Sequence, residues 1–104
     1  MKRLYFKKPV FNAGKNLTVR RGVKWAMNSS ERVVICDADG EPCGVGKITH
    51  ISVMRFKDLD SSDLINEHDP RCRNWAGLYN VMHEICPRFT MNEIVTLIEF
   101  EVEK

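Results

Sequence analysis

Apolar and polar residues alternate strictly over residues 16–20, where polar side chains flank both Leu17 and Val19. A period of two is typical of a β-strand, in which successive side chains point to opposite faces. The pattern predicts that Leu17 and Val19 enter a hydrophobic core and that Thr18 and Arg20 share the opposite face. We expect the rest of the chain to be organised around this strand.

Four further stretches that are rich in apolar residues are predicted to form strands. They cover residues 4–6, 33–36, 42–54 and 94–102. An Asp39–Gly40 pair after the second of them predicts a tight turn, because both residues tolerate the positive φ angles that such a turn requires. In the last stretch, Glu99 and Glu101 alternate with apolar residues, which indicates an outer strand with one solvated face.

Two helices are predicted between the long strand and the last one. Residues 60–63 offer N-cap side chains before Leu64, and Pro70 keeps this first helix short. Asn74 can cap a second helix, whose apolar residues recur at helical spacing until Pro87. These elements favour a mixed α/β (α+β) fold: a small, partly open β-barrel of about five to six strands with two or three short inserted helices. The expected core residues are Leu17, Val19, Val34, Ile48, Ile98 and Phe100.

Composition narrows the class of protein. A chain of 104 residues, 43% hydrophobic and 29% charged, has the make-up of one globular domain spanning residues 1–104. Because the net charge is only +2, a nucleic-acid site would have to come from a local cluster of cations. No segment is apolar enough for a signal peptide or a membrane span, so we expect a cytoplasmic protein with no membrane partner.

The four cysteines form no C-x-x-C pair and are interpreted as reduced thiols. Cys36 lies in an apolar run and is expected in the core. A zinc site built from His68, Cys72 and His83 is a weaker alternative, because the spacing matches no common ligand pattern. We therefore predict neither a metal nor any other cofactor.

A local group of cations surrounds the organising strand. Lys15, Arg20, Arg21 and Lys24 fall within ten residues, with the hydroxyl of Thr18 among them. Such a group predicts a cleft for an anionic or carbonyl-bearing ligand. Trp25 follows directly, either as a core or rim residue, which is the more common role of tryptophan in a small domain, or as a platform that stacks on a base.

The chain resembles the ASCH domain family, which belongs to the superfamily of PUA-like β-barrels. Lys15, Thr18 and Arg20 reproduce the family's Lys-x-x-Thr-x-Arg spacing, although the glycine expected two residues before the lysine is Ala13. The resemblance extends to Ile85-Cys86-Pro87, where the family often has Tyr-Pro, and to the closing strand over residues 95–100.

The resemblance implies a cleft that takes RNA or a modified nucleoside. In one branch of the family, this lysine and threonine, with a glutamate from the inserted helical segment, deacetylate 4-acetylcytidine. The lysine and threonine carry over to Lys15 and Thr18. Glu67 and Asp69 are the acidic candidates in the corresponding segment, although Arg71 is closer to the matching position when the helices are aligned through Pro87.

This resemblance leads to a catalytic hypothesis. Lys15, made a better base by neighbouring cations, would activate Thr18 for attack on the acetyl carbonyl. Arg20 would steady the developing oxyanion, and Glu67 or Asp69 would protonate the departing amine. The substrate would be bound by Arg20, Arg21, Lys24 and Trp25.

Two alternatives remain beside an amidohydrolase. The first is a non-catalytic module that binds RNA or a nucleotide, with Trp25 stacked on a base. The second, ranked last, is a ribonuclease in which Lys15, Arg20 and either His50 or His68 act on a phosphodiester. No obligate protein partner is predicted.

Overall fold

The computed structural model describes residues 1–103 and contains one five-stranded mixed sheet, one α-helix and three short 3-10 helices. The strands are β1 (Lys2–Tyr5), β2 (Lys15–Arg21), β3 (Arg32–Cys36), β4 (Pro42–Arg55) and β5 (Ile94–Val102). The helices are η1 (Phe56–Asp58), η2 (Ser61–Leu64), η3 (Pro70–Cys72) and α1 (Trp75–Ile85). Each predicted strand is present, and the predicted second helix is α1.

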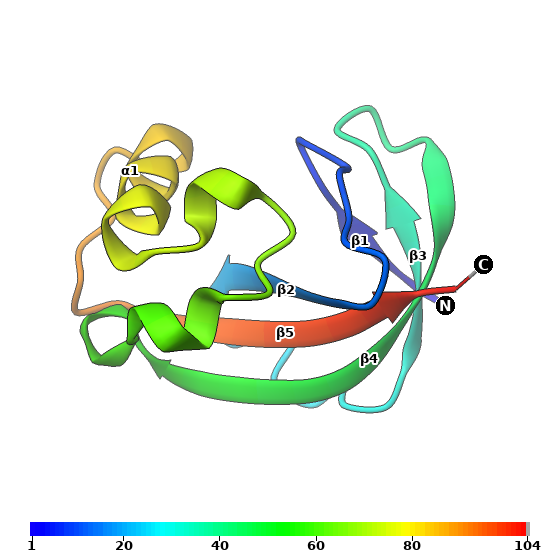
Figure 1. Ribbon diagram of the computed structural model, residues 1–104, viewed down its shortest axis with the longest axis horizontal. Helices are drawn as coiled ribbons and strands as arrows, with labels where there is room; N and C mark the ends of the chain where they lie inside the picture. Colours follow the sequence, from blue (N-terminus) through cyan, green and yellow to red (C-terminus); the bar gives the residue numbers. More distant parts are fainter. Residues whose placement is uncertain (104) are drawn as a thin grey trace.

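The sheet has the order β1-β3-β4-β5-β2, in which only the β1–β3 pair is parallel. Long β4 and β5 cross the molecule, with α1 at one end and β1 and β3 at the other (Figure 1). The prediction that residues 94–102 form an outer strand is wrong, because β5 lies between β4 and β2. Its near-continuous apolar run is buried on both faces, and only its last residues alternate.

The sheet is not closed into a barrel, contrary to the sequence-based expectation. Closure would require β1 to pair with β2, the two strands at the ends of the order. Instead, the outer edge of β2 is bonded to the segment that precedes η3. The Leu17 amide donates to the Asn66 carbonyl oxygen at 2.8 Å, and the Leu17 carbonyl accepts from the His68 amide at 3.0 Å. The strand predicted to organise the fold is therefore an edge strand.

Two hydrophobic clusters pack on opposite faces of the sheet. One contains Leu17, Val19 and Leu97 and packs against α1 and the 3-10 helices. The other contains Ile98 and Phe100 and packs against β1 and β3. Five of the six predicted core residues are buried, but Val34 is only half-buried, because Val33 and Ile35 take the inward face of β3.

Candidate functional site

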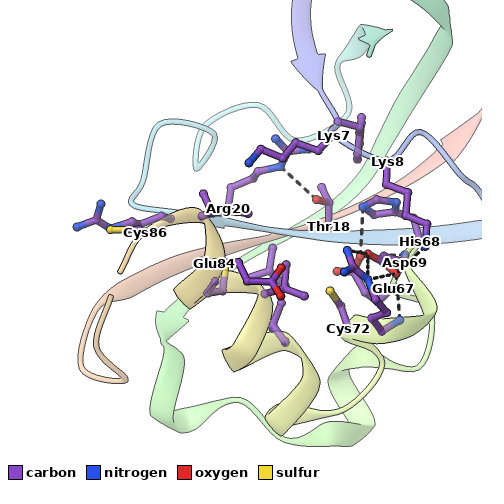
Figure 2. A pocket seen from close by; sticks show the side chains of 18 of the residues that line it. Lys7, Lys8, Thr18, Arg20, Glu67, His68, Asp69, Cys72, Glu84 and Cys86 are labelled. Atoms are coloured by element: carbon purple, nitrogen blue, oxygen red, sulfur yellow. Dashed lines mark hydrogen bonds and ion pairs between the residues drawn. The ribbon is translucent and has the colours of Figure 1, made fainter. Parts of the chain in front are cut away.

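A pocket of about 360 Å³ lies at the outer edge of β2. It is lined by residues 5–8 at the end of β1 and in the loop that follows, by residues 18–21 of β2, by the segment around η3 and by α1. Figure 2 shows Thr18 and Arg20 between the Lys7–Lys8 loop on one side and α1 on the other. The pocket thus combines a polar strand edge with a largely apolar helical wall.

Arg20 and Thr18 project from the same face of β2, as the alternation predicted. The Arg20 Nε donates a hydrogen bond to the Thr18 Oγ1 at 3.1 Å, and the guanidinium lies 4.6 Å from the centre of the Phe6 ring. Burial lowers the pKa of Arg20 to about 10, while attraction to Glu67 opposes that shift. Arg20 therefore remains charged at neutral pH, although its guanidinium is partly withdrawn from water.

Glu67 is almost completely buried, with 2% of its surface exposed. Its Oε1 accepts the Asp69 amide at 3.2 Å. Burial raises the pKa of the Glu67 carboxyl to about 8, and repulsion from Asp69 adds to the shift, whereas Arg20 and Arg73 oppose it. At neutral pH the carboxyl is therefore mostly protonated, so it can donate a hydrogen bond or a proton.

His68 lies beside Glu67 in the wall of the pocket. The His68 Nδ1 lies 3.1 Å from the Val10 carbonyl oxygen, and its Nε2 lies 3.3 Å from the Glu67 Oε1. Burial lowers the pKa of His68, so the ring is neutral. Since a carbonyl only accepts, Nδ1 carries the ring proton, which leaves the unprotonated Nε2 facing the Glu67 carboxyl.

Asp69 is held in an ion pair at the rim of the pocket. Burial acts to raise its pKa, but hydrogen bonds and charge from Arg71, with Lys8 nearby, outweigh burial and lower it. The Arg71 Nη2 lies 3.0 Å from the Asp69 Oδ2, and the Lys8 Nζ lies 3.8 Å from the Oδ1. Asp69 is therefore a carboxylate that positions cations, whereas Glu67 is the proton-bearing acid.

The structure brings together Thr18, Arg20, Arg21, Glu67 and Asp69, all of which line the pocket. Lys15 does not line it. The Lys15 side chain is 63% exposed, and its Nζ lies 4.0 Å from the Glu99 Oε1. Strand alternation explains this placement, because residues 15 and 18 differ in parity and so point to opposite faces.

Lys24 and Trp25 also lie outside the pocket. After Gly22, which has a φ of 82°, the chain turns back on itself. This turn exposes Lys24 and places Trp25, 7% exposed, in the cluster with Ile98 and Phe100. Trp25 is therefore a core residue rather than a stacking platform, and the four predicted cations do not line one cleft.

Several pocket residues were not assigned to the site from the sequence. Phe6, Lys7 and Lys8 come from the loop after β1, and Leu78 and Met82 come from the buried face of α1. The helical spacing of Leu78 and Met82 predicts burial but not proximity to β2, so only the tertiary structure places them there. The adjacent Lys7 and Lys8 carried a charge signal that could have been used.

Of the histidines and cysteines in the alternative hypotheses, His68 and Cys72 line the pocket, but His50 and His83 do not. His50 lines a different hollow of about 230 Å³ with Asp63 and Glu99, and its Nε2 lies 3.2 Å from the Ser52 Oγ. Within residues 1–103 no three His, Cys, Asp or Glu side chains are grouped to hold a metal, so the zinc alternative has no support. The same residues include no helix long and apolar enough to cross a membrane.

Comparison with known proteins identifies the fold. An ASCH domain from Lactobacillus crispatus JV V101 superposes with a TM-score of 0.62 at 15% identity, covering 86% of this chain and 65% of that one. A protein from Enterococcus faecalis V583, described by the family model DUF984, gives a TM-score of 0.60 at 17% identity, covering 86% and 64%. The chain thus spans less than two thirds of either protein.

No family model matches the sequence, and no curated protein is similar to it. The two structures therefore define the class by architecture. This chain has the fold of an ASCH domain, as the sequence resemblance implied.

Proposed function

We propose that this chain is an RNA-binding module that takes one nucleoside of the RNA into the pocket at the edge of β2. The pocket itself carries this proposal. Its volume of about 360 Å³ leaves room for a base and its ribose, and its walls combine apolar side chains with Arg20 and a protonated Glu67. Single-stranded RNA is commonly recognised through unstacked bases that enter such pockets.

Charge at the pocket rim supports a ligand that bears phosphate. Lys7 and Lys8 both line the pocket and lie on the same side of it in Figure 2. Much of the charge is already paired, since Arg21 bonds Glu93 at 2.6 Å and Arg71 bonds Asp69. The Lys8 Nζ also lies 3.8 Å from the Asp69 Oδ1. We therefore expect the phosphates next to the bound nucleoside to contribute to affinity, rather than a long phosphate backbone running across the molecule.

The test is binding of a short single-stranded RNA, followed by fluorescence anisotropy. Arg20→Ala is expected to weaken binding by about ten-fold or more, because Arg20 lines the pocket and carries a partly desolvated charge. Lys47→Ala removes an exposed lysine that does not line the pocket and is the matched control. Equal affinity of the wild type and Arg20→Ala, or no RNA binding at all, would contradict the proposal.

A second candidate function is hydrolysis of 4-acetylcytidine in the same pocket. The protonated Glu67 favours it, because a neutral carboxyl near a bound base can protonate a departing amine. Two observations argue against hydrolysis. The Thr18 Oγ1 accepts a hydrogen bond from Arg20, and the Lys15 side chain lies on the opposite face of β2, where it does not reach Thr18. Binding therefore ranks first.

Chromatography of the purified chain mixed with 4-acetylcytidine separates the two functions. Release of cytidine above the buffer control, lost in both Thr18→Ala and Glu67→Gln, would establish the hydrolase. Loss of the same turnover in Lys15→Ala would mean that Lys15 moves into the pocket when substrate binds. Without turnover, the binding function is the one to pursue.

A further inference from the structure

The outer edge of β2 is itself part of the pocket wall. Four consecutive residues, 18–21, line the pocket. Successive strand side chains alternate between the two faces of a sheet, so a pocket on one face would be lined by every second residue only. A pocket lined by four in a row therefore borders the edge of the strand, where outward-pointing backbone groups lie.

Hydrogen bonding along β2 shows which backbone groups point outward. Leu17 bonds outward to Asn66 and His68, whereas the Gly22 amide bonds inward to the Ile94 carbonyl oxygen at 2.8 Å. Alternate residues of an antiparallel edge strand bond to opposite sides, so Val19 has the same orientation as Leu17. Its N–H and C=O face the pocket, and neither has a hydrogen-bond partner within residues 1–103.

The unpaired groups of Val19 have walls on both sides of the sheet plane. On one side lie Leu78 and Met82 of α1, which belong to the same hydrophobic cluster as Val19. On the other side lie Phe6, from the second cluster, and the Arg20 guanidinium 4.6 Å from the Phe6 ring. A ligand bonded to this edge lies in the plane of the sheet, between an apolar wall and an aromatic–guanidinium wall.

We infer that the open edge at Val19 reads the hydrogen-bonding edge of a single nucleobase, an inference that rests on the proposed function and specifies how the pocket recognises its ligand. Val19 offers one donor and one acceptor that point the same way. Its ligand must therefore be flat and present an acceptor beside a donor. Cytosine does so with N3 and its 4-amino group, and proteins read unstacked RNA bases on this edge.

The open edge also explains why the pocket needs few polar side chains. Backbone N–H and C=O groups are held by the β2–β5 ladder, so they are already oriented before the ligand arrives and lose little entropy on binding. Arg20 then lies over the face of the base instead of along its edge, where a guanidinium stacks favourably.

A titration of the full ¹⁵N-labelled chain with cytidine tests this inference. We expect the Val19 amide resonance to shift on binding. N4,N4-dimethylcytidine lacks the amino N–H donor and should bind about ten-fold more weakly, since the Val19 carbonyl would be left unpaired. Equal affinity for the two nucleosides, or an unmoved Val19 resonance while other pocket amides shift, would overturn the inference.

A backbone substitution provides the second measurement. Replacing the Val19 amide by an ester through semisynthesis removes the N–H donor and keeps the valine side chain. The same replacement at Val23, an exposed valine that does not line the pocket, is the matched control. The Val19 ester should lose about ten-fold in cytidine affinity and the Val23 ester should not.

The outcomes distinguish this inference from the function on which it rests. If RNA and cytidine bind but both esters behave like the unmodified chain, the edge inference fails and the RNA-binding function stands. If neither RNA nor cytidine binds, both fail together.

Discussion

Glu67 and Arg20 determine the charge state of the pocket. Both are affected mainly by burial, which pushes each toward its neutral form, and the attraction between them opposes both shifts. Because the ordinary pKa of arginine is so high, Arg20 stays charged, whereas Glu67 becomes mostly neutral. The centre of the pocket therefore carries one positive charge next to a proton donor.

This difference predicts how stability depends on pH. In the unfolded chain Glu67 titrates near 4.5, but in the folded chain its pKa is about 8. Between these values the folded chain retains a proton that the unfolded chain has lost. The free energy of unfolding should therefore fall as pH rises through this window, by an amount on the order of 3–5 kcal/mol.

Glu67→Gln keeps the shape and hydrogen-bonding capacity of the protonated acid but cannot ionise. Urea unfolding of both proteins from about pH 5 to about pH 9 should show the wild type losing this stability and the variant retaining it. The difference between the two curves isolates Glu67, since His68 titrates in both proteins. Parallel curves would mean that Glu67 has an ordinary pKa.

At the level of elements, the junction of η3 and α1 forms the helical side of the pocket. The Asn74 Oδ1 caps α1 by accepting the Gly77 amide at 2.8 Å. Gly77 then passes so close to η3 that a Cβ there would overlap the Arg71 carbonyl oxygen. Close packing at one glycine thus sets the position of Cys72 and Arg71 relative to Leu78.

Gly77→Ala is therefore expected to destabilise the protein, although alanine is the better helix former. The overlap should cost about 2 kcal/mol or more, exceeding the gain of up to about 1 kcal/mol in helix propensity. Urea unfolding provides the measurement. Gly14→Ala, where an added Cβ meets no atom within 4 Å, is the matched control and should change stability little. An unchanged or higher stability of Gly77→Ala would contradict this packing.

At the level of the whole molecule, two hydrophobic clusters share one sheet. Trp25 belongs to the cluster beside β1 and β3, and Trp75 packs against the cluster beside α1. The side chains of β5 alternate between the two clusters, since Val95 and Leu97 belong to the one beside α1 and Ile98 and Phe100 belong to the other. Because neither cluster can lose β5 without exposing the other, we propose that residues 1–104 unfold as one unit.

The two tryptophans allow a direct test. In Trp75→Phe, the remaining Trp25 reports the cluster beside β1 and β3. In Trp25→Phe, the remaining Trp75 reports the cluster beside α1. Within each variant, the fluorescence and far-UV circular dichroism transitions in urea should have the same midpoint. Separate transitions would show two independently folding parts.

Local patterns were sufficient to predict most elements. The Asn74 cap and Pro87 bounded α1, and the apolar stretch of β5 matched its observed limits. The Asp39–Gly40 turn also formed, with Gly40 at a φ of 84°. These features depend on neighbouring residues, whose steric preferences and capping hydrogen bonds act within a few positions of the chain.

Site residues were only partly predictable, because patterns among neighbouring residues do not show which distant segments cover a strand. Alternation correctly placed Thr18 and Arg20 on one face of β2, but it did not show that this face is covered. Thr18 is buried, and so is Asn16, whose side chain accepts the Asn12 amide at 2.7 Å and donates to the Asn12 and Gly14 carbonyls at 3.2 Å. Polar side chains on a strand therefore did not identify a solvated face.

The sequence by itself determined where strands, turns and the helix lie, and which side chains share a face. Only the tertiary structure decided that β2 is an edge strand, that the sheet stays open and that Glu67 lies beside Arg20. These features depend on hydrogen bonds and packing between segments about fifty or more residues apart, such as the bond from Leu17 to Asn66. A period of two fixes the relative orientation of the side chains along one strand. Which segment pairs with each edge of that strand depends on contacts from the rest of the chain.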